Sequence, residues 1–450
     1  MSQTLMISVS GIRGIVGSDL TPELVARHAA AFGAWSRAAG NSCIVLARDA
    51  RTSGAMFAQA AAAGLLSVGC EVIELGVVPT PTAQLAVEHH RAGAGLIITA
   101  SHNPVEWNAL KFVGPDGIFL DATTGAAVRA LAEEGPPRVS WNQIARVRPD
   151  AGAIERHVEA VLARPEVQLD AIRRARFRVA LDCVRGAGGA ILPQLLERLG
   201  CEVVGINLET DGRFPREPEP IPENLAELSA LVTASGAHVG MAVDPDVDRL
   251  ALVDERGTPI GEDYTLAFAV RAVLGKSESL PTVVANLSTS LVVEDAARDG
   301  GARFVRAPVG ESHVARAIQA EGALIGGEGN GGVILPALHV GRDAPLGVAL
   351  ILQYLAQVGR PVSALVAAAP QYRIVKAKLK RGADLPSAFA ALKGRFPAAV
   401  VDERDGLRLA WQDRWLHLRQ SGTEPVIRII AEAPSEGEAE ALVNAVRSFL

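Results

Sequence analysis

A serine able to carry a covalent phosphate follows an apolar segment near residue 100. The polar stretch Thr99-Ala100-Ser101-His102-Asn103-Pro104 comes directly after Gly95-Leu96-Ile97-Ile98. This pattern predicts a buried strand that ends in a turn, with the Ser101 hydroxyl at the carboxyl end of the strand, where open α/β sheets bind ligands. The stretch does not match the G-x-S-x-G pattern of acyl-transfer enzymes. Alone, it is also compatible with an ordinary polar turn.

Three aspartates at alternating positions follow a second apolar segment. Asp244, Asp246 and Asp248 come after the strand-like segment 239–243. Three carboxylates in one turn repel one another unless a cation joins them. Mg²⁺ prefers a few carboxylates together with phosphate oxygens, so this turn predicts a magnesium site. The neighbouring Arg249 could then contact a phosphate on that metal.

Other loops use similar acids. An EF-hand loop would place a glutamate where Glu255 stands, but it needs glycine in the place of Arg249. The nucleophilic aspartate motif of haloacid-dehalogenase-like phosphatases also follows a strand, and it would make Asp244 the residue that carries phosphate. The residues after the second acid match that motif only in part. A solvated acidic turn is the remaining alternative.

Two further polar loops could hold a phosphorylated sugar. The first, Gly326 to Gly332, contains glycines that permit tight turns, and its Glu328 and Asn330 can accept hydrogen bonds from hydroxyls. It matches neither the Walker A nor the dinucleotide-binding spacing. The second, Arg419-Gln420-Ser421-Gly422-Thr423-Glu424-Pro425 with Arg428 after it, supplies several donors on one loop. That set of donors suits a phosphate dianion.

The composition argues against several classes of partner. A net charge of −6 gives no general attraction to nucleic acid or to an anionic membrane, and 4% aromatic residues provide few stacking platforms. The four cysteines have no C-x-x-C spacing, which favours small core residues in a reducing compartment. Neither a signal-peptide pattern nor an apolar run of membrane-spanning length is found, so we expect a cytoplasmic protein. No oligomeric state is predicted.

Strand-like and helix-like segments alternate along the chain in three sets of about 100 residues each. The first set has a helix start at Thr21-Pro22-Glu23 and strands near 43–47, 71–75 and 95–99. The second has strands near 178–181, 202–206 and 238–243, with helices near 187–199 and 224–234. The third has strands near 282–285, 303–306 and 323–326, with helices near 262–274, 291–299 and 311–319. The pattern predicts α/β domains at 1–150, 151–252 and 253–365, followed by an α+β domain at 366–450.

Together, and in this order, the four motifs resemble those of the α-D-phosphohexomutase family, whose members include phosphoglucosamine mutase, phosphomannomutase and phosphoglucomutase. The likeness covers essentially the whole chain and includes Gly11-Ile12-Arg13-Gly14. The resemblance implies three similar α/β domains with mixed sheets and a smaller C-terminal α+β domain around a central cleft. Each domain would contribute one loop, for the serine, the metal, the sugar and the phosphate in turn.

The resemblance also implies a mechanism. Ser101 would carry a phosphoryl group, and Mg²⁺ held by the three aspartates and a phosphoserine oxygen would polarise that group for transfer to a phosphorylated hexose. The product, a hexose 1,6-bisphosphate, would turn around and return its other phosphate, and it would also act as activator. The remaining roles are charge stabilisation by Arg13 and Arg249, proton transfer by Lys111 or His102, sugar binding by Glu328 and Asn330, and phosphate binding by Arg419, Ser421, Gly422, Thr423 and Arg428.

The chain departs from many relatives at several positions. Asn330 and Gly332 stand where many relatives have Ser and His, and Glu311 follows Gly310 where many have His. These differences leave the general base open between Lys111 and His102, although Lys111 could equally be a strand-edge charge and His102 could shape the serine turn.

The predicted substrate rests on one glycine. Gly422 resembles the residue of phosphoglucosamine mutases, so the predicted reaction interconverts glucosamine 6-phosphate and glucosamine 1-phosphate. The alternatives are a phosphomannomutase/phosphoglucomutase, a haloacid-dehalogenase-like phosphatase and an inactive phosphosugar-binding protein.

Overall fold

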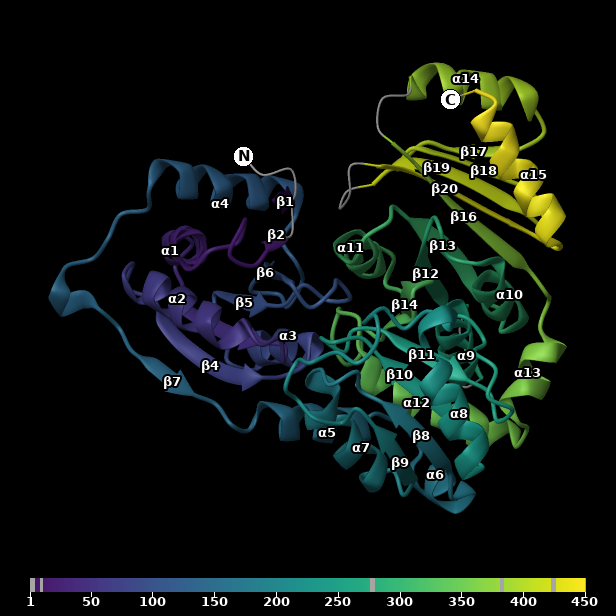
Figure 1. The fold of residues 1–450 in the computed structure, drawn as a ribbon, viewed down its shortest axis with the longest axis horizontal. Helices are drawn as coiled ribbons and strands as arrows, with labels where there is room; N and C mark the ends of the chain where they lie inside the picture. Colours follow the sequence, from purple (N-terminus) through teal and green to yellow (C-terminus); the bar gives the residue numbers. More distant parts are fainter. Residues whose placement is uncertain (1–4, 9–10, 276–279, 381–383, 422–425, 450) are drawn as a thin grey trace.

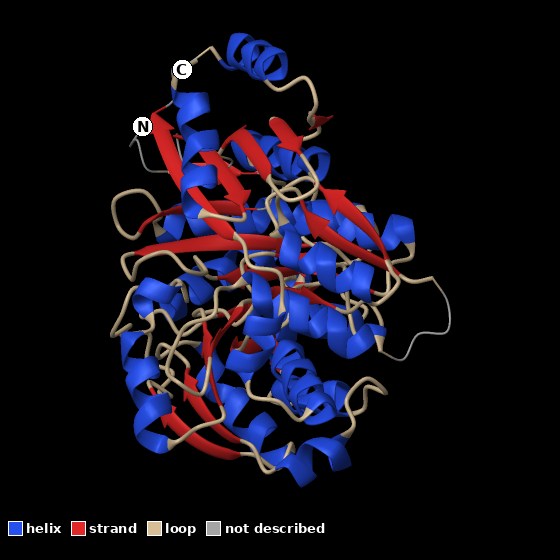
Figure 2. Cartoon of the chain, turned by 90° about the vertical axis from the view of Figure 1, so that its right-hand side faces the viewer, coloured by secondary structure: helices blue, strands red, loops and turns tan. Residues whose placement is uncertain are grey.

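The chain forms four successive sheets, each with its own helices (Figure 1). The computed structural model describes residues 5–8, 11–275, 280–380, 384–421 and 426–449. Figure 2 shows helices and strands interleaved along the length of the molecule. The three similar α/β domains with mixed sheets and the smaller C-terminal α+β domain predicted from the sequence are confirmed. The boundaries between them stay predictions.

The first sheet has seven strands in the order β1-β2-β6-β5-β3-β4-β7. Its centre is parallel, whereas β1, β2 and β6 run antiparallel to their neighbours. The helix start at Thr21 is confirmed, since its side chain accepts the Leu24 N–H at the beginning of α1. The bounds are β1 Met6–Ser8, β2 Gly11–Ile15, α1 Pro22–Ala38, β3 Cys43–Arg48, α2 Gly54–Leu66, β4 Glu71–Val77, α3 Thr80–His89, β5 Ala94–Ile98, β6 Trp107–Val113, α4 Ala122–Glu134, η1 Trp141–Gln143 and β7 Val147–Pro149.

The second sheet has the order β11-β10-β8-β9, with β11 antiparallel. The single helix predicted over 187–199 is wrong, because a 3₁₀ turn (η2) precedes a shorter helix (α7). A Cβ at Gly189 would lie 1.8 Å from the Leu208 carbonyl oxygen, so two backbones approach closely there and the regular helix begins only at Leu192. The bounds are α5 Ala153–Leu162, α6 Leu169–Ala175, β8 Arg178–Asp182, η2 Ala187–Ala190, α7 Leu192–Arg198, β9 Glu202–Ile206, η3 Pro222–Asn224, α8 Ala226–Ser235, β10 Val239–Val243 and β11 Leu250–Val253.

The third sheet repeats this arrangement in the order β13-β12-β14-β15, with β15 antiparallel. The long apolar helix α12 packs against α5, α6 and α9, and one continuous core joins the second and third domains. Among the described residues no single helix is long and apolar enough to cross a membrane; α12 and α13 meet that test only as a pair bent by 81°. The bounds are α9 Asp263–Leu274, β12 Thr282–Asn286, α10 Leu291–Asp299, β13 Arg303–Ala307, α11 Glu311–Glu321, β14 Ile325–Glu328, β15 Gly332–Ile334, α12 Ala344–Val358 and α13 Val362–Ala368.

The fourth sheet is wholly antiparallel in the order β16-β20-β19-β18-β17 and has a separate core. Alternating buried positions along β20 give it one face on that core and one face outward. The bounds are β16 Arg373–Lys380, α14 Leu385–Arg395, β17 Val400–Asp402, β18 Leu407–Ala410, β19 Trp415–Gln420, β20 Val426–Ala433 and α15 Glu436–Arg447.

Candidate active site

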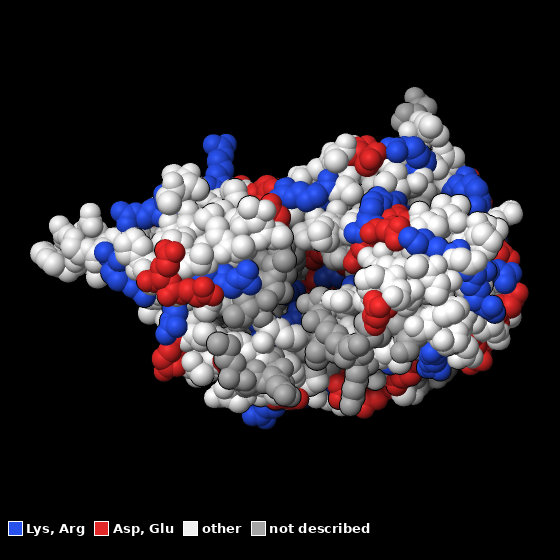
Figure 3. All heavy atoms as spheres, turned by 90° about the horizontal axis from the view of Figure 1, so that it is seen from above, with Lys and Arg blue, Asp and Glu red and all other residues white. Residues whose placement is uncertain are grey.

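The serine, metal and sugar loops predicted from the sequence each follow a strand of a different sheet. Figure 3 shows a hollow in the face of the molecule seen from above, with acidic and basic atoms inside it. The serine loop follows β5, the metal loop joins β10 to β11, and the sugar loop joins β14 to β15. Each loop follows the carboxyl end of a parallel strand, which is the edge at which α/β sheets bind ligands.

Ser101 lies in a strained turn and touches the metal loop of the second domain. Its φ of 50° is left-handed, and only 3% of the residue is exposed. The Ser101 N–H donates to the Thr99 Oγ1 at 2.9 Å. The Ser101 hydroxyl donates to the Asp244 Oδ2 at 3.0 Å and lies 3.3 Å from the His102 Nδ1. The serine is therefore held within reach of the predicted metal site.

Arg51 holds the serine turn, and the sequence analysis did not identify it. The Arg51 side chain is buried and pairs with Asp49 at 3.1 Å. Its guanidinium donates to four carbonyl oxygens of the turn, namely those of Ser101, Asn103, Pro104 and Trp107. The available signal was the position of Asp49 and Arg51 directly after β3, at the same sheet edge as Ser101.

The left-handed turn at Ser101 leads to a stability prediction. The free energy of unfolding of Ser101→Gly is expected to be about 1 kcal/mol higher than that of Ser101→Ala. A residue with a Cβ costs about 1–2 kcal/mol in this left-handed conformation, and glycine does not. Both variants lack the hydroxyl, so the comparison isolates the backbone. Urea unfolding followed by circular dichroism measures the difference. Equal stability of the two variants would contradict the strained turn.

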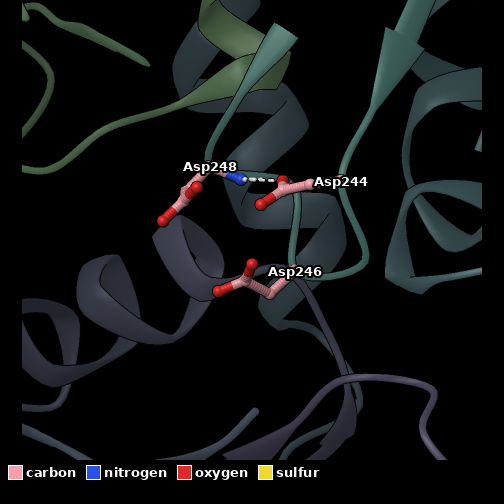
Figure 4. Close-up of side chains that lie close together, drawn as sticks. All are labelled: Asp244, Asp246 and Asp248. Atoms are coloured by element: carbon pink, nitrogen blue, oxygen red, sulfur yellow. Dashed lines mark hydrogen bonds between the residues drawn. The ribbon is translucent and has the colours of Figure 1, made fainter. Parts of the chain in front are cut away.

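Asp244, Asp246 and Asp248 converge on one point (Figure 4), and their ligand oxygens lie within 4.8 Å of one another. All three are buried. Within the described residues, the Asp246 Oδ1 and the Asp248 Oδ1 are buried without a hydrogen-bond partner. Buried carboxylate oxygens left in this way require a cation or protons. The residues therefore fit a hard divalent cation such as Mg²⁺.

Lys111 faces this cluster from β6. Its Nζ donates to the Asp246 Oδ2 at 2.7 Å and lies 3.8 Å from the Asp248 Oδ2. Burial acts to lower the pKa of Lys111, but the two aspartates outweigh it and raise that pKa. The Thr80 hydroxyl, at the start of α3, donates to the same Asp246 oxygen at 2.7 Å. Lys111 is thus a charged donor that binds the first domain to the metal loop.

Burial and charge separate the protonation behaviour of the acids. Burial raises the pKa of Asp244 well above its usual value, and Asp248 and Asp246 add to this effect. Burial acts in the same sense on Asp246, but Lys111 outweighs it and the pKa of Asp246 is lowered. Asp244 thus favours the protonated form and Asp246 the ionised form, although the two carboxylates lie only a few ångströms apart. A bound cation would allow both to be ionised.

Arg13, Arg249 and His102 lie at the serine turn and the neighbouring metal loop. The Arg13 Nη1 donates to the Asn103 Oδ1 at 2.6 Å, and burial lowers the pKa of Arg13 to about 10. The Arg249 Nη1 donates to the Glu219 Oε1 at 3.2 Å, and its Nε lies 3.8 Å from the Asp248 Oδ1. Burial, with Arg249 and Arg13, holds the pKa of His102 well below its usual value. His102 is therefore neutral at pH 7.

The sugar loop places Glu328 at the end of β14, where it is only 3% exposed. Its Oε1 accepts from the Asn286 side chain at 2.8 Å and from the Gly310 N–H at 3.0 Å. Its Oε2 accepts from the Arg342 Nη1 at 2.8 Å. The Asn330 side chain accepts the Gly332 N–H at 3.3 Å and shapes the loop. Arg342 is a second site residue that the sequence analysis did not assign.

The predicted phosphate loop lies on the fourth sheet. Arg419 on β19 and Arg428 on β20 stand directly opposite each other, and burial lowers the pKa of Arg419. Like charges in that relation repel, so an anion between them would be stabilised. Ser421 is buried and its N–H donates to the Val426 carbonyl oxygen at 2.9 Å. Gly422 and Thr423 lie outside the described residues.

His417 joins the third and fourth domains. Its Nε2 lies 2.7 Å from the Asp405 carbonyl oxygen, which can only accept, so its Nδ1 accepts from the Ser288 hydroxyl at 2.8 Å. Burial lowers the pKa of His417 to about 4, from 6.5. The folded state therefore holds His417 neutral, and this stabilisation is complete above pH 6.5 and is lost as the pH falls toward 4.

A pH series tests this junction. From pH 7 to pH 5 the wild type is expected to lose about 2 kcal/mol more unfolding free energy than His417→Gln, which has no ring to protonate. Urea unfolding at both pH values gives the comparison. A difference between the two proteins that does not change with pH would contradict the neutral, buried imidazole.

Comparisons with known proteins agree along the whole chain. Residues 5–138, 155–257, 261–372 and 374–448 match domains I, II, III and the C-terminal domain of phosphoglucomutase/phosphomannomutase. A phosphoglucomutase/phosphomannomutase of Thermococcus kodakarensis is 39% identical, with 95% of this chain and 94% of that protein covered. A probable phosphoglucosamine mutase of Methanopyrus kandleri is 38% identical, with 96% and 95% covered.

Solved structures give the same result. A phosphoglucomutase/phosphomannomutase family protein from Burkholderia thailandensis superimposes with a TM-score of 0.87 at 26% identity, with 99% of this chain and 96% of that chain covered. An Aspergillus fumigatus N-acetylphosphoglucosamine mutase, solved with GlcNAc-6P and magnesium, shares the fold at a TM-score of 0.63 and 15% identity, with 99% and 95% covered. The chain belongs to the phosphoglucomutase/phosphomannomutase family, whose members are isomerases that shift phosphate within sugar phosphates.

Proposed function

We propose that this chain is a magnesium-dependent phosphoglucosamine mutase that works through a phosphoserine at Ser101 and a hexose 1,6-bisphosphate. The observation that carries the proposal is the hydrogen bond from the Ser101 hydroxyl to Asp244, inside the cluster of three aspartates. Relatives named for either sugar class are about equally similar. The choice of glucosamine over mannose or glucose therefore rests on Gly422 in the phosphate loop.

The metal would be held by Asp244, Asp246 and Asp248. When bound, Mg²⁺ supplies positive charge against the phosphoryl oxygens, which is the main requirement of phosphoryl transfer. Arg13, which donates to Asn103 of the serine turn, and Arg249, which lies beside Asp248 of the metal loop, stabilise the charge that spreads over the transferred group. The phosphoserine would add a further oxygen to the metal site.

Transfer also moves a proton from the attacking sugar hydroxyl to the departing Ser101 oxygen. Lys111 is held in the charged form by Asp246, so it can give a proton but not take one. In the half-reaction in which the free Ser101 hydroxyl attacks the bisphosphate, His102 is neutral and lies 3.3 Å from that oxygen, so it can take the proton. We assign the acceptor role to His102 and the donor role toward the departing sugar oxygen to Lys111 in that half-reaction, and both proton transfers run in reverse when the sugar hydroxyl attacks.

The far end of the substrate would be anchored by the fourth domain. Arg419 and Arg428 bind the phosphate that is not being transferred, together with Ser421, Gly422 and Thr423. Glu328 and Asn330 contact the sugar hydroxyls. An anchor made of guanidinium and hydroxyl donors accepts the phosphate in either orientation of the bisphosphate, as the two half-reactions require.

The expected partner is a phosphorylated hexose. All four cysteines are free, which supports a reducing compartment, and we place the protein in the cytoplasm.

Phosphorus NMR tests the reaction and the sugar. With Mg²⁺ and a trace of hexose 1,6-bisphosphate, the 1-phosphate signal is expected to grow fastest from glucosamine 6-phosphate, more slowly from the glucose and mannose 6-phosphates. A faster reaction with mannose or glucose 6-phosphate would support mutase activity but would show that glucosamine 6-phosphate is not the preferred substrate. Release of free phosphate without any 1-phosphate would contradict the mutase.

A further inference from the structure

Arg342 contacts three acids from two domains. Its Nε donates to the Glu311 Oε2 at 3.0 Å, its Nη1 to the Glu328 Oε2 at 2.8 Å and its Nη2 to the Asp248 Oδ2 at 2.6 Å. The residue is only 7% exposed. Asp248 belongs to the metal loop and Glu328 to the sugar loop, so one guanidinium spans both predicted loops. The first domain also joins this network, because the Nε2 of Gln84 on α3 donates to the Glu311 Oε1 at 3.3 Å.

The charges require this arrangement. Asp248, Glu311 and Glu328 are all buried, and without a cation among them they would repel one another. Burial acts to raise the pKa of Glu328, but Arg342 and Asn286 hold it below its usual value. The planar fork of arginine can donate to three carboxylates in fixed directions, whereas a lysine ammonium is a single compact charge.

Gly332 in the sugar loop makes room for this side chain. A Cβ at Gly332 would lie 2.2 Å from the Arg342 Cδ and 2.9 Å from its Cγ. A larger residue at position 332 would therefore collide with the Arg342 side chain, which explains why this position of the sugar loop is a glycine. The backbones of the two loops also touch, since the Leu250 N–H donates to the Gly331 carbonyl oxygen at 3.0 Å.

We propose that Arg342 is a positioning residue that fixes Asp248 and Glu328 relative to each other and so couples metal binding to sugar phosphate binding. Arg342 occupies one oxygen of Asp248 and leaves the Oδ1, which has no hydrogen-bond partner among the described residues, for the cation. A partner that orients a metal ligand in this way strengthens metal binding. A cation that fixes Asp248 also orders Arg342 and Glu328, so the sugar phosphate then loses less conformational entropy on binding.

The first test concerns the metal alone and does not depend on the proposed function. Isothermal titration calorimetry with Mg²⁺ is expected to give a dissociation constant about tenfold weaker for Arg342→Lys than for the wild type. The matched control is Arg316→Lys, which alters a surface ion pair between α11 and Asp116 and should leave the affinity unchanged. An unchanged Mg²⁺ affinity in Arg342→Lys would overturn the proposal.

The second test rests on the proposed function and measures coupling in unphosphorylated enzyme. Saturating glucosamine 6-phosphate is expected to tighten Mg²⁺ binding about tenfold in the wild type and to leave it nearly unchanged in Arg342→Lys. Equal coupling in both proteins, or none in the wild type, would overturn the link. If Arg342→Lys does not fold, Gly332→Ala keeps the charge and displaces the guanidinium, and the same results are expected for it. If the wild type makes no 1-phosphate but the Mg²⁺ titration gives the expected difference, the proposed function is wrong and the role of Arg342 in metal binding stands.

Discussion

Ser101→Ala is expected to lose mutase turnover by a factor of about 10⁵ or more, the size of effect seen when a covalent nucleophile is removed. The Ser101 oxygen is the atom on which the phosphate would rest between the two half-reactions. Water cannot replace it, because spontaneous cleavage of a phosphate monoester is among the slowest reactions known. The rate of 1-phosphate formation, followed by phosphorus NMR, measures the loss.

The control for this variant is Ser53→Ala. Ser53 lies in the same domain, where its hydroxyl accepts from the Asn108 side chain at 2.9 Å, and its removal should leave turnover close to that of the wild type. Substantial turnover in Ser101→Ala, with normal circular dichroism, would contradict the phosphoserine mechanism.

Asp246→Asn is expected to reduce magnesium-dependent turnover by roughly 10³-fold, which corresponds to about 4 kcal/mol of transition-state stabilisation. The variant keeps the shape of the side chain but removes the charge that faces both the cation site and Lys111. Lys111 loses its stronger partner as a result. Turnover measured over a Mg²⁺ titration should show both a lower maximum and a weaker apparent affinity for the metal.

Asp254→Asn is the matched control for this variant. Asp254 directly follows the neighbouring strand β11, and its Oδ1 accepts two backbone N–H groups, which an amide oxygen can accept equally well. Its turnover and magnesium dependence should match those of the wild type. If Asp246→Asn also behaves like the wild type, the metal assignment is wrong.

The sequence predicts the residues that stand directly after strands better than it predicts their partners. Ser101 and the three aspartates follow short apolar runs. The local pattern identifies such runs as buried strands, so the residues that come after them lie at the edge of the sheet where the strands end. The helix start at Thr21 is equally local, because the capping residue and the capped N–H are three positions apart.

The partners of these residues depend on packing between domains. Lys111 and Asp246 are 135 positions apart, and Arg342 and Asp248 are 94 apart. Nothing in the local sequence indicates that Arg51 turns its guanidinium toward the serine turn. The four motifs could be recognised together through their resemblance to a family, but the network that joins them becomes visible only when the sheets are assembled.

The most direct test of the central claim is to locate the phosphate on the enzyme. The purified chain is incubated with Mg²⁺ and hexose 1,6-bisphosphate, treated with acid, digested and sequenced by tandem mass spectrometry. The account predicts an acid-stable phosphate on Ser101 that is absent from Ser101→Ala. A phosphate on Asp244 that is removed by hydroxylamine, with Ser101 unmodified, would contradict it.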